Sequence, residues 1–402
     1  MLAADPAACD AAPDAAALAA LAERHGTPLY VYDLGRVAAR AARLRTAFGG
    51  RVSLSYAVKA NPHGGVLSGL RGLVETLDVS SLGEFRRAIA AGWQPGDISF
   101  TGPGKRPAEL SESIGAGLGE LVIEHPAEAR AADAIARAAG RVQDVLVRIT
   151  PPAVPRGFGD TMAGRPVPFG IDAEDAVPAL REIATLPGLR LTGLHFYSGT
   201  QCLSAPAIAA NYRIFHELSA RLCAETGLSP ARLVFGAGMG IPYHETDAPL
   251  DLPALGAEAS ADLDRMREEP QLAGAAVALE LGRYLVGPAG WLLTRVVAVK
   301  HSRGHRILIC DAGLNNHLAA AGRFGMVLHR NYRMSAPLAG GEAEPQDVFG
   351  PLCTSLDRLA SGVMLPPLDP GGLIAIHMSG AYGLTASPTG FISHPVPGEV
   401  VI

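Results

Sequence analysis

The stretch SLSYAVKANP, residues 53–62, decides how the rest of the chain is interpreted. Its small and apolar residues predict a buried strand that ends at one lysine, Lys59, before Asn61 and Pro62 turn the chain. Most lysines at a strand end extend their amine into water, because an unpaired charge is costly to bury. A lysine amine is also the group that bonds to an aldehyde cofactor. Polar groups at neighbouring strand ends would favour this second interpretation.

Composition limits the classes of protein to consider. The chain has 402 residues, 48% of them hydrophobic, which is enough for a large core and two domains. Its net charge of −5 argues against nucleic acid and anionic membranes as partners. No apolar run has the length of a transmembrane helix, and the N-terminal segment, with Asp5, Asp10 and Asp14, does not fit a signal peptide.

The cysteine pattern predicts a reducing, cytoplasmic setting without a zinc or other metal site. The five cysteines are scattered, odd in number and without CxxC spacing. They are Cys9, Cys202, Cys223, Cys310 and Cys353.

A regular alternation of strands and helices predicts an α/β fold for residues 35–285. Strands are expected at 53–58, 76–80, 97–101, 120–124, 144–149, 190–196, 232–236 and 277–281. Helices are expected at 36–47, 64–72, 82–91, 126–139, 174–186, 206–225 and 254–267. About eight βα units fit a (β/α)₈ TIM barrel. An open, doubly wound sheet would need a glycine fingerprint after an early strand, and the sequence has none there.

Residues 286–402 predict a C-terminal, mostly-β domain. Short β-like runs occur at 292–299, 305–310, 326–329 and 373–378, with the final PVPGEVVI as a further strand. Residues 1–34, which contain a tail, a helix at 14–25 and a strand at 28–32, are expected to join this domain. The Pro- and Gly-rich segment 150–169 is either a disordered insertion or a lid near the site.

Polar residues lie at the ends of several predicted barrel strands, where barrel enzymes place their sites. They are Lys59, Asp78, His195, Glu280 and the glycine loop GAGMG at 236–240. Glycines allow backbone N–H groups to surround a phosphate, a glutamate can accept the proton of a ring nitrogen, and a histidine can stack on a ring. Each feature also has an ordinary explanation: a tight turn, an ion pair with Arg283, or a buried core histidine. Together they describe pyridoxal phosphate.

Several motifs follow one another along nearly the whole chain. They are YAVKAN around Lys59, LDVSSLGE (77–84), FTGPGK (100–105), HFYSGTQ (195–201), GAGMG (236–240), ELGR (280–283), DAGLNN (311–316), GPLCTSLD (350–357) and GAYG (380–383). In this order they resemble the fold-type III pyridoxal-phosphate decarboxylases, the group of diaminopimelate, ornithine and arginine decarboxylases.

The resemblance implies roles for individual residues. Lys59 would bind the cofactor covalently, His195 would stack on its pyridine face and Glu280 would keep the pyridine nitrogen protonated, with Asp78 beside them. The phosphate ligands would be Ser198, Gly238, Gly240, Arg283 and Tyr382.

The family resemblance also implies a homodimer with two shared active sites. Cys353 and Asp357 belong to a motif that, in the family, reaches the site of the other subunit, with Thr354 and Tyr382 also facing the substrate. Cys353 would return a proton to the α-carbon after carbon dioxide leaves.

Two departures from diaminopimelate decarboxylases bear on the substrate. Thr354 stands where their CES motif has a glutamate for the distal amino group. The segment NNHLAAAGRF (315–324) has alanines where they carry an arginine for the distal carboxylate, and Arg323 is out of register. A charged substrate end needs a paired partner, so diaminopimelate should be recognised poorly. Only a rebuilt clamp, from Arg323 or His317, would restore it.

The stretch GIPYHETDAPLDL (240–252), with HFYSGTQ and GPLCTSLD, resembles a subgroup from antibiotic and other specialised pathways. Some of its members decarboxylate an amino acid that is held as a thioester on an acyl carrier protein. The resemblance thus implies a pyridoxal-phosphate-dependent α-decarboxylase of a carrier-bound glutamyl or aspartyl group.

Three alternatives stay open. One is a decarboxylase of diaminopimelate or another free L-amino acid. A racemase would need a second base, which the sequence does not identify. A non-catalytic regulatory homologue should have lost site residues, whereas Lys59, His195, Glu280, Cys353 and Tyr382 are all present.

Overall fold

The computed structural model describes residues 14–322 and 330–402. The chain divides into two compact units. The first contains residues 1–40, 241–248 and 283–402, and the second contains residues 41–240 and 249–282. The segment 241–248 thus belongs to the first unit, and the domain boundaries at 34/35 and 285/286 stay predictions.

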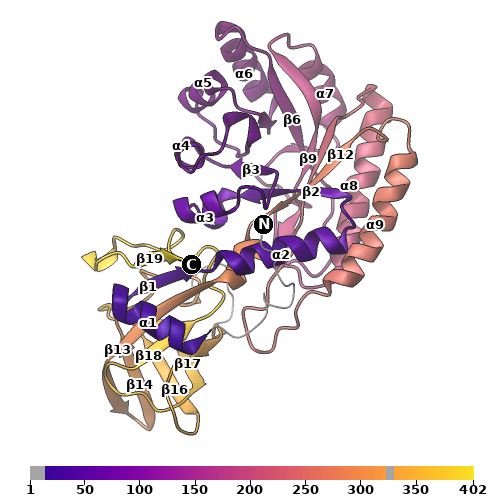
Figure 1. Cartoon of the computed structure of the whole chain (residues 1–402). Coiled ribbons are helices and arrows are strands. Elements are labelled where there is room, and N and C mark those ends of the chain that lie inside the picture. Colours follow the sequence, from indigo (N-terminus) through magenta and orange to yellow (C-terminus); the bar gives the residue numbers. More distant parts are fainter. Residues whose placement is uncertain (1–13, 323–329) are drawn as a thin grey trace. The chain divides into compact units, whose positions relative to one another are not determined.

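The second unit is a closed barrel of eight parallel strands (Figure 1). Each strand pairs with the next, and the last pairs with the first. In spatial order they are β2 (Val52–Ala57), β3 (Thr76–Val79), β4 (Ile98–Phe100), β5 (Glu120–Ile123), β6 (Gln143–Thr150), β9 (Leu189–Phe196), β11 (Arg232–Gly236) and β12 (Ala276–Leu281). The predicted TIM barrel is confirmed.

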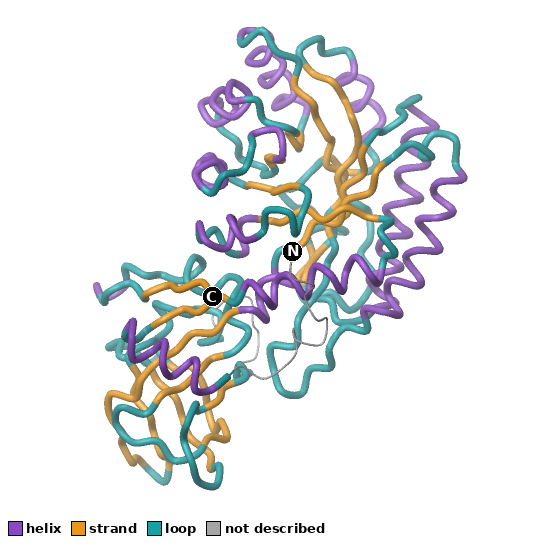
Figure 2. Tube along the Cα trace, in the orientation of Figure 1, coloured by secondary structure: helices purple, strands orange, loops and turns teal. Residues whose placement is uncertain are grey.

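Helices flank the strands of this barrel, as the purple segments of Figure 2 show. They are α2 (Leu34–Ala47), which precedes β2, and α3 (Gly64–Gly69), α4 (Leu82–Ala90), α5 (Pro107–Ala116), α6 (Pro126–Ala138), α7 (Ala176–Ala184), α8 (Ala205–Thr226) and α9 (Leu252–Glu268). Helix α5 was not predicted, because its sequence PAELSESIGA has only a short apolar stripe. It begins at Pro107, where Glu109 accepts a hydrogen bond from the backbone N–H of Arg106.

The Pro- and Gly-rich segment 150–169 is ordered by the loop that follows β9. Strand β7 (Asp160–Thr161) pairs antiparallel with β10 (Gly199–Thr200). The Met162 N–H donates to the Ser198 carbonyl at 2.7 Å. Strand β8 (Ile171–Asp172) then returns the chain to β6. The prediction of a disordered insertion is therefore wrong, while a lid stays a prediction.

The first unit is built on a mostly-β sheet, which confirms the predicted fold class of this part. The sheet order is β15-β18-β13-β14-β16-β17. The bounds are β13 (Gly290–Ser302), β14 (His305–Cys310), β15 (Met334–Ser335), β16 (Glu344–Phe349), β17 (Arg358–Leu365) and β18 (Leu373–Ile376). The predicted run at 326–329 lies outside the described residues. Strands β16 and β17 were not predicted; the register between them is irregular, and their sequences do not alternate clearly.

The two ends of the chain meet in this sheet. Strand β1 (Leu29–Tyr32) pairs antiparallel with β13 and parallel with β19 (Gly398–Val401). Helix α1 (Ala15–His25) is capped by the Asp14 carboxylate and by Gly26. Its Leu18 packs in a buried cluster with Trp291 and Leu293 of β13. Segments from opposite ends of the sequence therefore share one core.

The described residues contain no helix with the length and apolar character that a membrane span needs. Nor do they contain a group of three or more His, Cys, Asp or Glu residues placed to hold a metal ion.

Replacing Leu18 tests how firmly α1 belongs to the first unit. Leu18 is 3% exposed, so Leu18→Ala should leave a cavity and lower the free energy of unfolding by about 2–5 kcal/mol. Chemical denaturation, with hydrogen exchange of β1 and β13, measures the effect. The control is Arg24→Ala on the exposed side of α1. Equal stability of both variants would contradict a structural role for the α1 contact.

Candidate active site

A layer of polar residues closes one end of the barrel core. Val122, Leu146, Val234 and Ala278, one from each of four strands, form an apolar cluster. Side chains two residues further along a strand face the same side of the sheet. Those positions hold Glu124, Arg148, Gly236 and Glu280. The carboxyl ends of the parallel strands thus carry ionisable groups above an apolar floor, as barrel active sites do.

Lys59 lies just beyond the strand that was predicted to end with it. Strand β2 ends at Ala57, and Lys59 lies in the short 3₁₀ helix η2 (Val58–Ala60). The Asn61 N–H donates to the Val58 carbonyl at 3.0 Å, and the Asn61 side chain accepts the His63 N–H at 3.0 Å. This turn fixes the backbone of Lys59, and its Nζ lies 5.6 Å from the ring centroid of Tyr197.

His195 and Glu280 form a buried hydrogen-bonded pair. Nε2 of His195 lies 2.9 Å from Oε2 of Glu280, and the residues are 1% and 4% exposed. Burial alone would raise the pKa of Glu280. The hydrogen bond and charge of His195, with the charges of Lys59 and Arg148, outweigh burial and hold that pKa below its ordinary value. Glu280 is therefore an ionised carboxylate.

Asp78 lies near the end of β3, and its pKa is shifted in the opposite direction from that of Glu280. It is 2% exposed, and its Oδ1 accepts a hydrogen bond from the Thr101 hydroxyl at 2.5 Å. Burial and then the charge of Glu280 raise its pKa well above the ordinary value, against the lowering effects of Lys59 and Thr101. Two neighbouring carboxyl groups therefore differ in their readiness to ionise.

The glycine loop after β11 runs alongside the loop after β9. The Cys202 N–H donates to the Gly238 carbonyl at 3.0 Å, and the Gly240 N–H donates to the Cys202 carbonyl at 2.8 Å. Gly238 has φ +69°, and a Cβ there would lie 2.6 Å from the Phe158 ring. The Gly240 amide is thus bonded inside the protein, and a Cβ at Gly240 would lie 2.9 Å from the Gln201 backbone, so this glycine allows the two loops to pack closely.

Several buried polar atoms of the second unit have no hydrogen-bond partner among the described residues, and three of them are of particular interest. They are Oδ2 of Asp78, Nδ1 of His195 and the hydroxyl of Ser198. All three belong to predicted site residues at the carboxyl ends of strands. Because buried polar groups normally find a partner, these atoms fit a bound ligand with ring and phosphate groups such as pyridoxal phosphate.

The sequence analysis did not identify three residues of this polar layer, which are Glu124, Arg148 and Tyr197. Arg148 is 5% exposed and pairs with Glu124 at 3.2 Å. Tyr197 has the Lys59 and Arg148 cations near its ring. A charged residue inside the apolar run DVLVRI was a usable signal for Arg148, because charges are rarely buried without a purpose. Glu124 ends the predicted strand 120–124 and Tyr197 lies in HFYSGTQ, so the strand-end position was a usable signal for both as well.

The predicted phosphate ligands Arg283 and Tyr382 belong to the first unit. The Arg283 guanidinium lies 4.8 Å from the Tyr382 ring centroid and donates to the Tyr243 hydroxyl at 2.5 Å. Tyr243 comes from the 240–252 stretch that suggested a specialised subgroup. Nε of Arg283 is buried without a hydrogen-bond partner among the described residues.

The GPLCTSLD loop contains one exposed and one buried candidate. Cys353 is exposed to solvent. Asp357 is 1% exposed and accepts the backbone N–H groups of Leu314 at 2.6 Å and Leu352 at 2.8 Å. The Asp357 carboxylate therefore joins two loops of the first unit. The Thr354 hydroxyl accepts the Leu356 N–H at 3.3 Å.

Of the two residues considered for a rebuilt distal clamp, the structure describes only His317. His317 is completely buried, and its ring nitrogens contact the Ser379 hydroxyl at 3.1 Å and the Ala320 N–H at 3.1 Å. Burial lowers the pKa of His317 to about 4, so it is neutral near pH 7. Arg323 lies outside the described residues.

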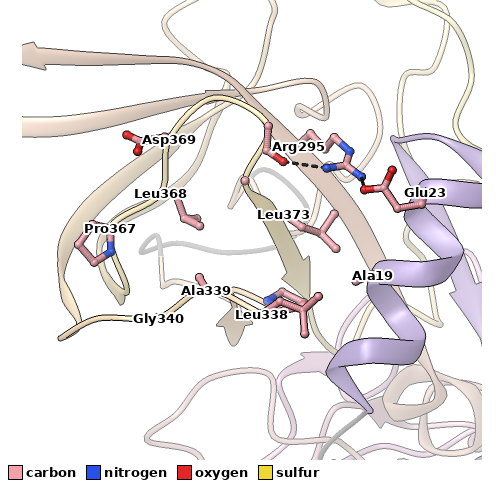
Figure 3. A pocket seen from close by; sticks show the side chains of 13 residues that line it. Ala19, Glu23, Arg295, Leu338, Ala339, Gly340, Pro367, Leu368, Asp369 and Leu373 are labelled. Carbon is pink, nitrogen blue, oxygen red and sulfur yellow. Dashed lines mark hydrogen bonds and ion pairs between the residues drawn. The ribbon is translucent and has the colours of Figure 1, made fainter.

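The first unit also has a hollow of about 330 Å³, lined by α1 and by loops of the β sheet (Figure 3). Arg295 at its edge is bonded to Glu23 at 2.5 Å and to the Gly371 carbonyl at 2.8 Å. Its other walls are largely apolar, including Leu338 and Leu373. None of the predicted site residues lines this hollow.

The barrel, its buried charges and Lys59 define a class of enzyme that uses an aldehyde cofactor, and comparison with known proteins gives the family. Residues 34–287 match the model of the pyridoxal-binding domain of pyridoxal-dependent decarboxylases. This chain belongs to that family, and it is a pyridoxal-phosphate-dependent carboxy-lyase.

Full-length relatives agree with this assignment. The L-glutamyl-[BtrI acyl-carrier protein] decarboxylase of Niallia circulans is 30% identical over 96% of this chain and 91% of its own. The diaminopimelate decarboxylase of Helicobacter pylori, solved with L-lysine, has a TM-score of 0.84 and 27% identity over 96% of this chain and 94% of its own. A structure of SrLDC with PLP and cadaverine has a TM-score of 0.81 and 26% identity over 98% and 94%.

Asp78 makes stability depend on pH. Because its folded-state pKa is raised above the unfolded value of about 3.9, the folded protein binds this proton more tightly. The stability that Asp78 contributes is therefore present below pH 4 and is lost as pH rises through the folded pKa. Asp78→Asn cannot titrate and keeps an oxygen for Thr101. Its free energy of unfolding, relative to wild type, should rise between pH 4 and 8.

Denaturation at a series of pH values measures this difference. The control is Asp160→Asn, at an exposed position, whose difference from wild type should stay flat. A flat profile for Asp78→Asn as well would show that the pKa of Asp78 is not raised.

Proposed function

We propose that this decarboxylase acts on a glutamyl or aspartyl group held as a thioester on an acyl carrier protein. The observation that carries the proposal is Thr354, a short neutral residue where diaminopimelate decarboxylases have a glutamate. A tethered substrate has no free distal carboxylate or distal amine, so it needs no charged clamp. The carrier-protein substrate of the Niallia circulans relative supports the same choice.

The state of His317 argues in the same direction. Its imidazole is buried, neutral and bonded on both nitrogens, so it cannot pair with a substrate carboxylate without breaking these contacts. Free diaminopimelate would leave a charged end unpaired in the site, which costs affinity.

We assign covalent attachment of the cofactor to Lys59. The chain has only three lysines, Lys59, Lys105 and Lys300. The Lys105 side chain is 1% exposed, lies 2.6 Å from Glu128 and donates to two backbone carbonyls. Lys300 is exposed on β13. Lys59 is thus the lysine whose amine lies among the polar residues at the strand ends.

Other residues of the second unit would hold the remaining parts of the cofactor. Pyridoxal phosphate, when bound, supplies the electron sink for the electron pair that carbon dioxide leaves behind. The ionised Glu280 would accept the hydrogen bond of a protonated ring nitrogen, and its bond to His195 fixes the imidazole orientation for stacking. The Ser198 hydroxyl and the backbone at Gly238 would bind phosphate oxygens, while Gly240 would keep the glycine loop packed against residues 201–202.

Residues of the first unit keep the roles that the resemblance implies. Arg283 and Tyr382 are proposed phosphate ligands. Cys353, exposed on its loop, is the proposed proton donor to the α-carbon in a homodimer with shared sites. The buried Asp357 would act through its two backbone hydrogen bonds, which hold the loop of Cys353 and Thr354. The setting we propose is the cytoplasm, within a specialised pathway such as antibiotic biosynthesis.

Mass spectrometry of a substrate panel tests the proposed substrate class. The panel contains free diaminopimelate, lysine, ornithine, arginine, glutamate and aspartate, together with glutamyl and aspartyl groups loaded on a phosphopantetheinyl carrier. We expect loss of carbon dioxide only from the loaded forms. Turnover of free diaminopimelate would refute the proposal and return the enzyme to the diaminopimelate decarboxylases.

Replacing Thr354 should shift this selectivity. Thr354→Glu would supply a carboxylate for a distal amine, so activity on free diaminopimelate should appear while activity on the carrier-bound group falls. The ratio of kcat/KM values for the two substrates measures the shift. Thr354→Gln, similar in shape but neutral, is the control. An unchanged ratio in Thr354→Glu would place residue 354 away from the substrate.

Replacing Lys59 tests its role in binding the cofactor. Lys59→Ala should lower kcat by roughly 10²–10⁴-fold, the range for loss of a reacting side chain. Borohydride reduction followed by peptide mapping should locate the cofactor on the peptide of residue 59. Lys300→Ala is the control and should keep full activity. A labelled peptide containing residue 105 or 300 would contradict the assignment.

A further inference from the structure

Tyr197 points to the same side of the barrel wall as His195. Tyr197 directly follows the last residue of β9, Phe196, and its ring contacts Lys59 and Arg148 at the strand ends, whereas Phe196 faces the other way. Phe196 stacks on Phe215 of α8 at 5.2 Å between ring centroids, which marks its face as the outer one. Tyr197 therefore lies just above His195 at the mouth of the barrel.

Room for the Tyr197 ring depends on Gly236. A Cβ at Gly236 would lie 2.2 Å from Cδ2 of Tyr197, closer than any side chain tolerates. The end of β11 thus carries a glycine where the ring packs. Gly236 has a packing reason of its own, separate from the anion-binding role predicted for the glycine loop.

Two cations lie near this one aromatic ring. Nζ of Lys59 is 5.6 Å and Cζ of Arg148 is 5.9 Å from the Tyr197 ring centroid, both within the range of cation–π attraction. Arg148 also lies 4.7 Å from the Phe169 ring centroid and pairs with Glu124. Its charge is therefore compensated without Tyr197, whereas the Lys59 charge is the one that changes during the reaction.

Other charged groups act on Lys59 from neighbouring elements. Asp78 of β3, Glu84 of α4 and Glu280 of β12 all interact electrostatically with its amine. Burial and Glu280 raise the pKa of Asp78, and burial raises that of Glu84, while Lys59 lowers both. Glu280 is ionised but hydrogen-bonded to His195. A neutral aromatic face is thus a further source of attraction for the Lys59 cation.

We propose that Tyr197 is a positioning residue that stabilises the protonated nitrogen of Lys59 through the face of its ring. This inference rests on the proposed attachment of the cofactor to Lys59. The ring holds the Lys59 nitrogen in place both when it is bonded to the cofactor and when substrate has displaced it. Loss of the ring should lower the pKa of that nitrogen and loosen its orientation, with the phenol hydroxyl playing no part.

The test is a pH titration of the holoenzyme without substrate. The visible absorbance of the cofactor bonded to Lys59 reports the protonation of the Lys59 nitrogen. Tyr197→Phe should titrate like wild type, because it keeps the ring face. Tyr197→Leu should shift the midpoint downward by roughly half a pH unit, the shift equivalent to one exposed cation–π contact.

A second series keeps the shape of the ring, so the test does not depend on folding of the leucine variant. Phenylalanines with increasing fluorination at position 197 withdraw electrons from the ring face and should lower the midpoint stepwise. Phe169→Leu is the matched control, since that ring lies on Arg148, and its midpoint should stay at the wild-type value.

The experiments distinguish failure of the Tyr197 role from failure of the proposed function. A midpoint that stays constant across the fluorinated series and in Tyr197→Leu would overturn the role of Tyr197, even with the cofactor confirmed on Lys59. A cofactor found on another lysine by peptide mapping would instead overturn the proposed function on which the inference rests. Activity gives a second measurement. In a plot of kcat against pH, the limb that reports the Lys59 nitrogen should move to lower pH in Tyr197→Leu, by the same amount as the absorbance midpoint.

Discussion

The hydrogen bond between His195 and Glu280 is the contact on which the barrel site depends. Both side chains are buried, and a buried carboxylate without a partner would take up a proton or destabilise the fold. The same constraint governs the neighbouring strands. Arg148 pairs with Glu124, and Lys105 pairs with Glu128. An end of the barrel that carries so many ionisable groups stays folded because most of their charges are matched inside the protein.

Buried polar atoms without a protein partner, and carboxyl groups with shifted pKa values, indicate where a ligand would bind. Glu280 is driven towards ionisation by His195 and nearby cations, while burial drives the adjacent Asp78 towards protonation. Environments that separate the pKa values of two neighbouring carboxyl groups assign them different chemical roles. The Ser198 hydroxyl and Nδ1 of His195 are left without protein partners at the same rim. These donors and acceptors at the rim are the groups that a polar ligand such as the cofactor would complete.

The sequence could predict the barrel because its buried strands and helices alternate regularly, and the structure confirms all eight strands. It could also predict which residues lie at or just beyond the strand ends, including His195 in β9 and Lys59, which lies two residues after β2. It could not predict the partners across strands. Nothing in the local pattern says that Glu124 faces Arg148, or that Tyr197 packs over Gly236, because such contacts depend on barrel register. The prediction missed strands β16 and β17 for a related reason, because bulges break the alternation of side chains on which strand prediction relies.

Specificity in this family then follows from which charges the protein provides for the far end of the substrate. The residues proposed for the cofactor end, Lys59, His195 and Glu280, would be needed whatever amino acid is bound, so they would not distinguish one substrate from another. The far end differs: a charged group there must meet an opposite charge or lose several kcal/mol of binding, on the order of the cost of an unpaired buried charge. Thr354 offers a hydroxyl that already accepts a backbone N–H, and His317 is neutral and enclosed. The carrier-bound substrate that we propose would meet this condition, because its far end is an uncharged thioester.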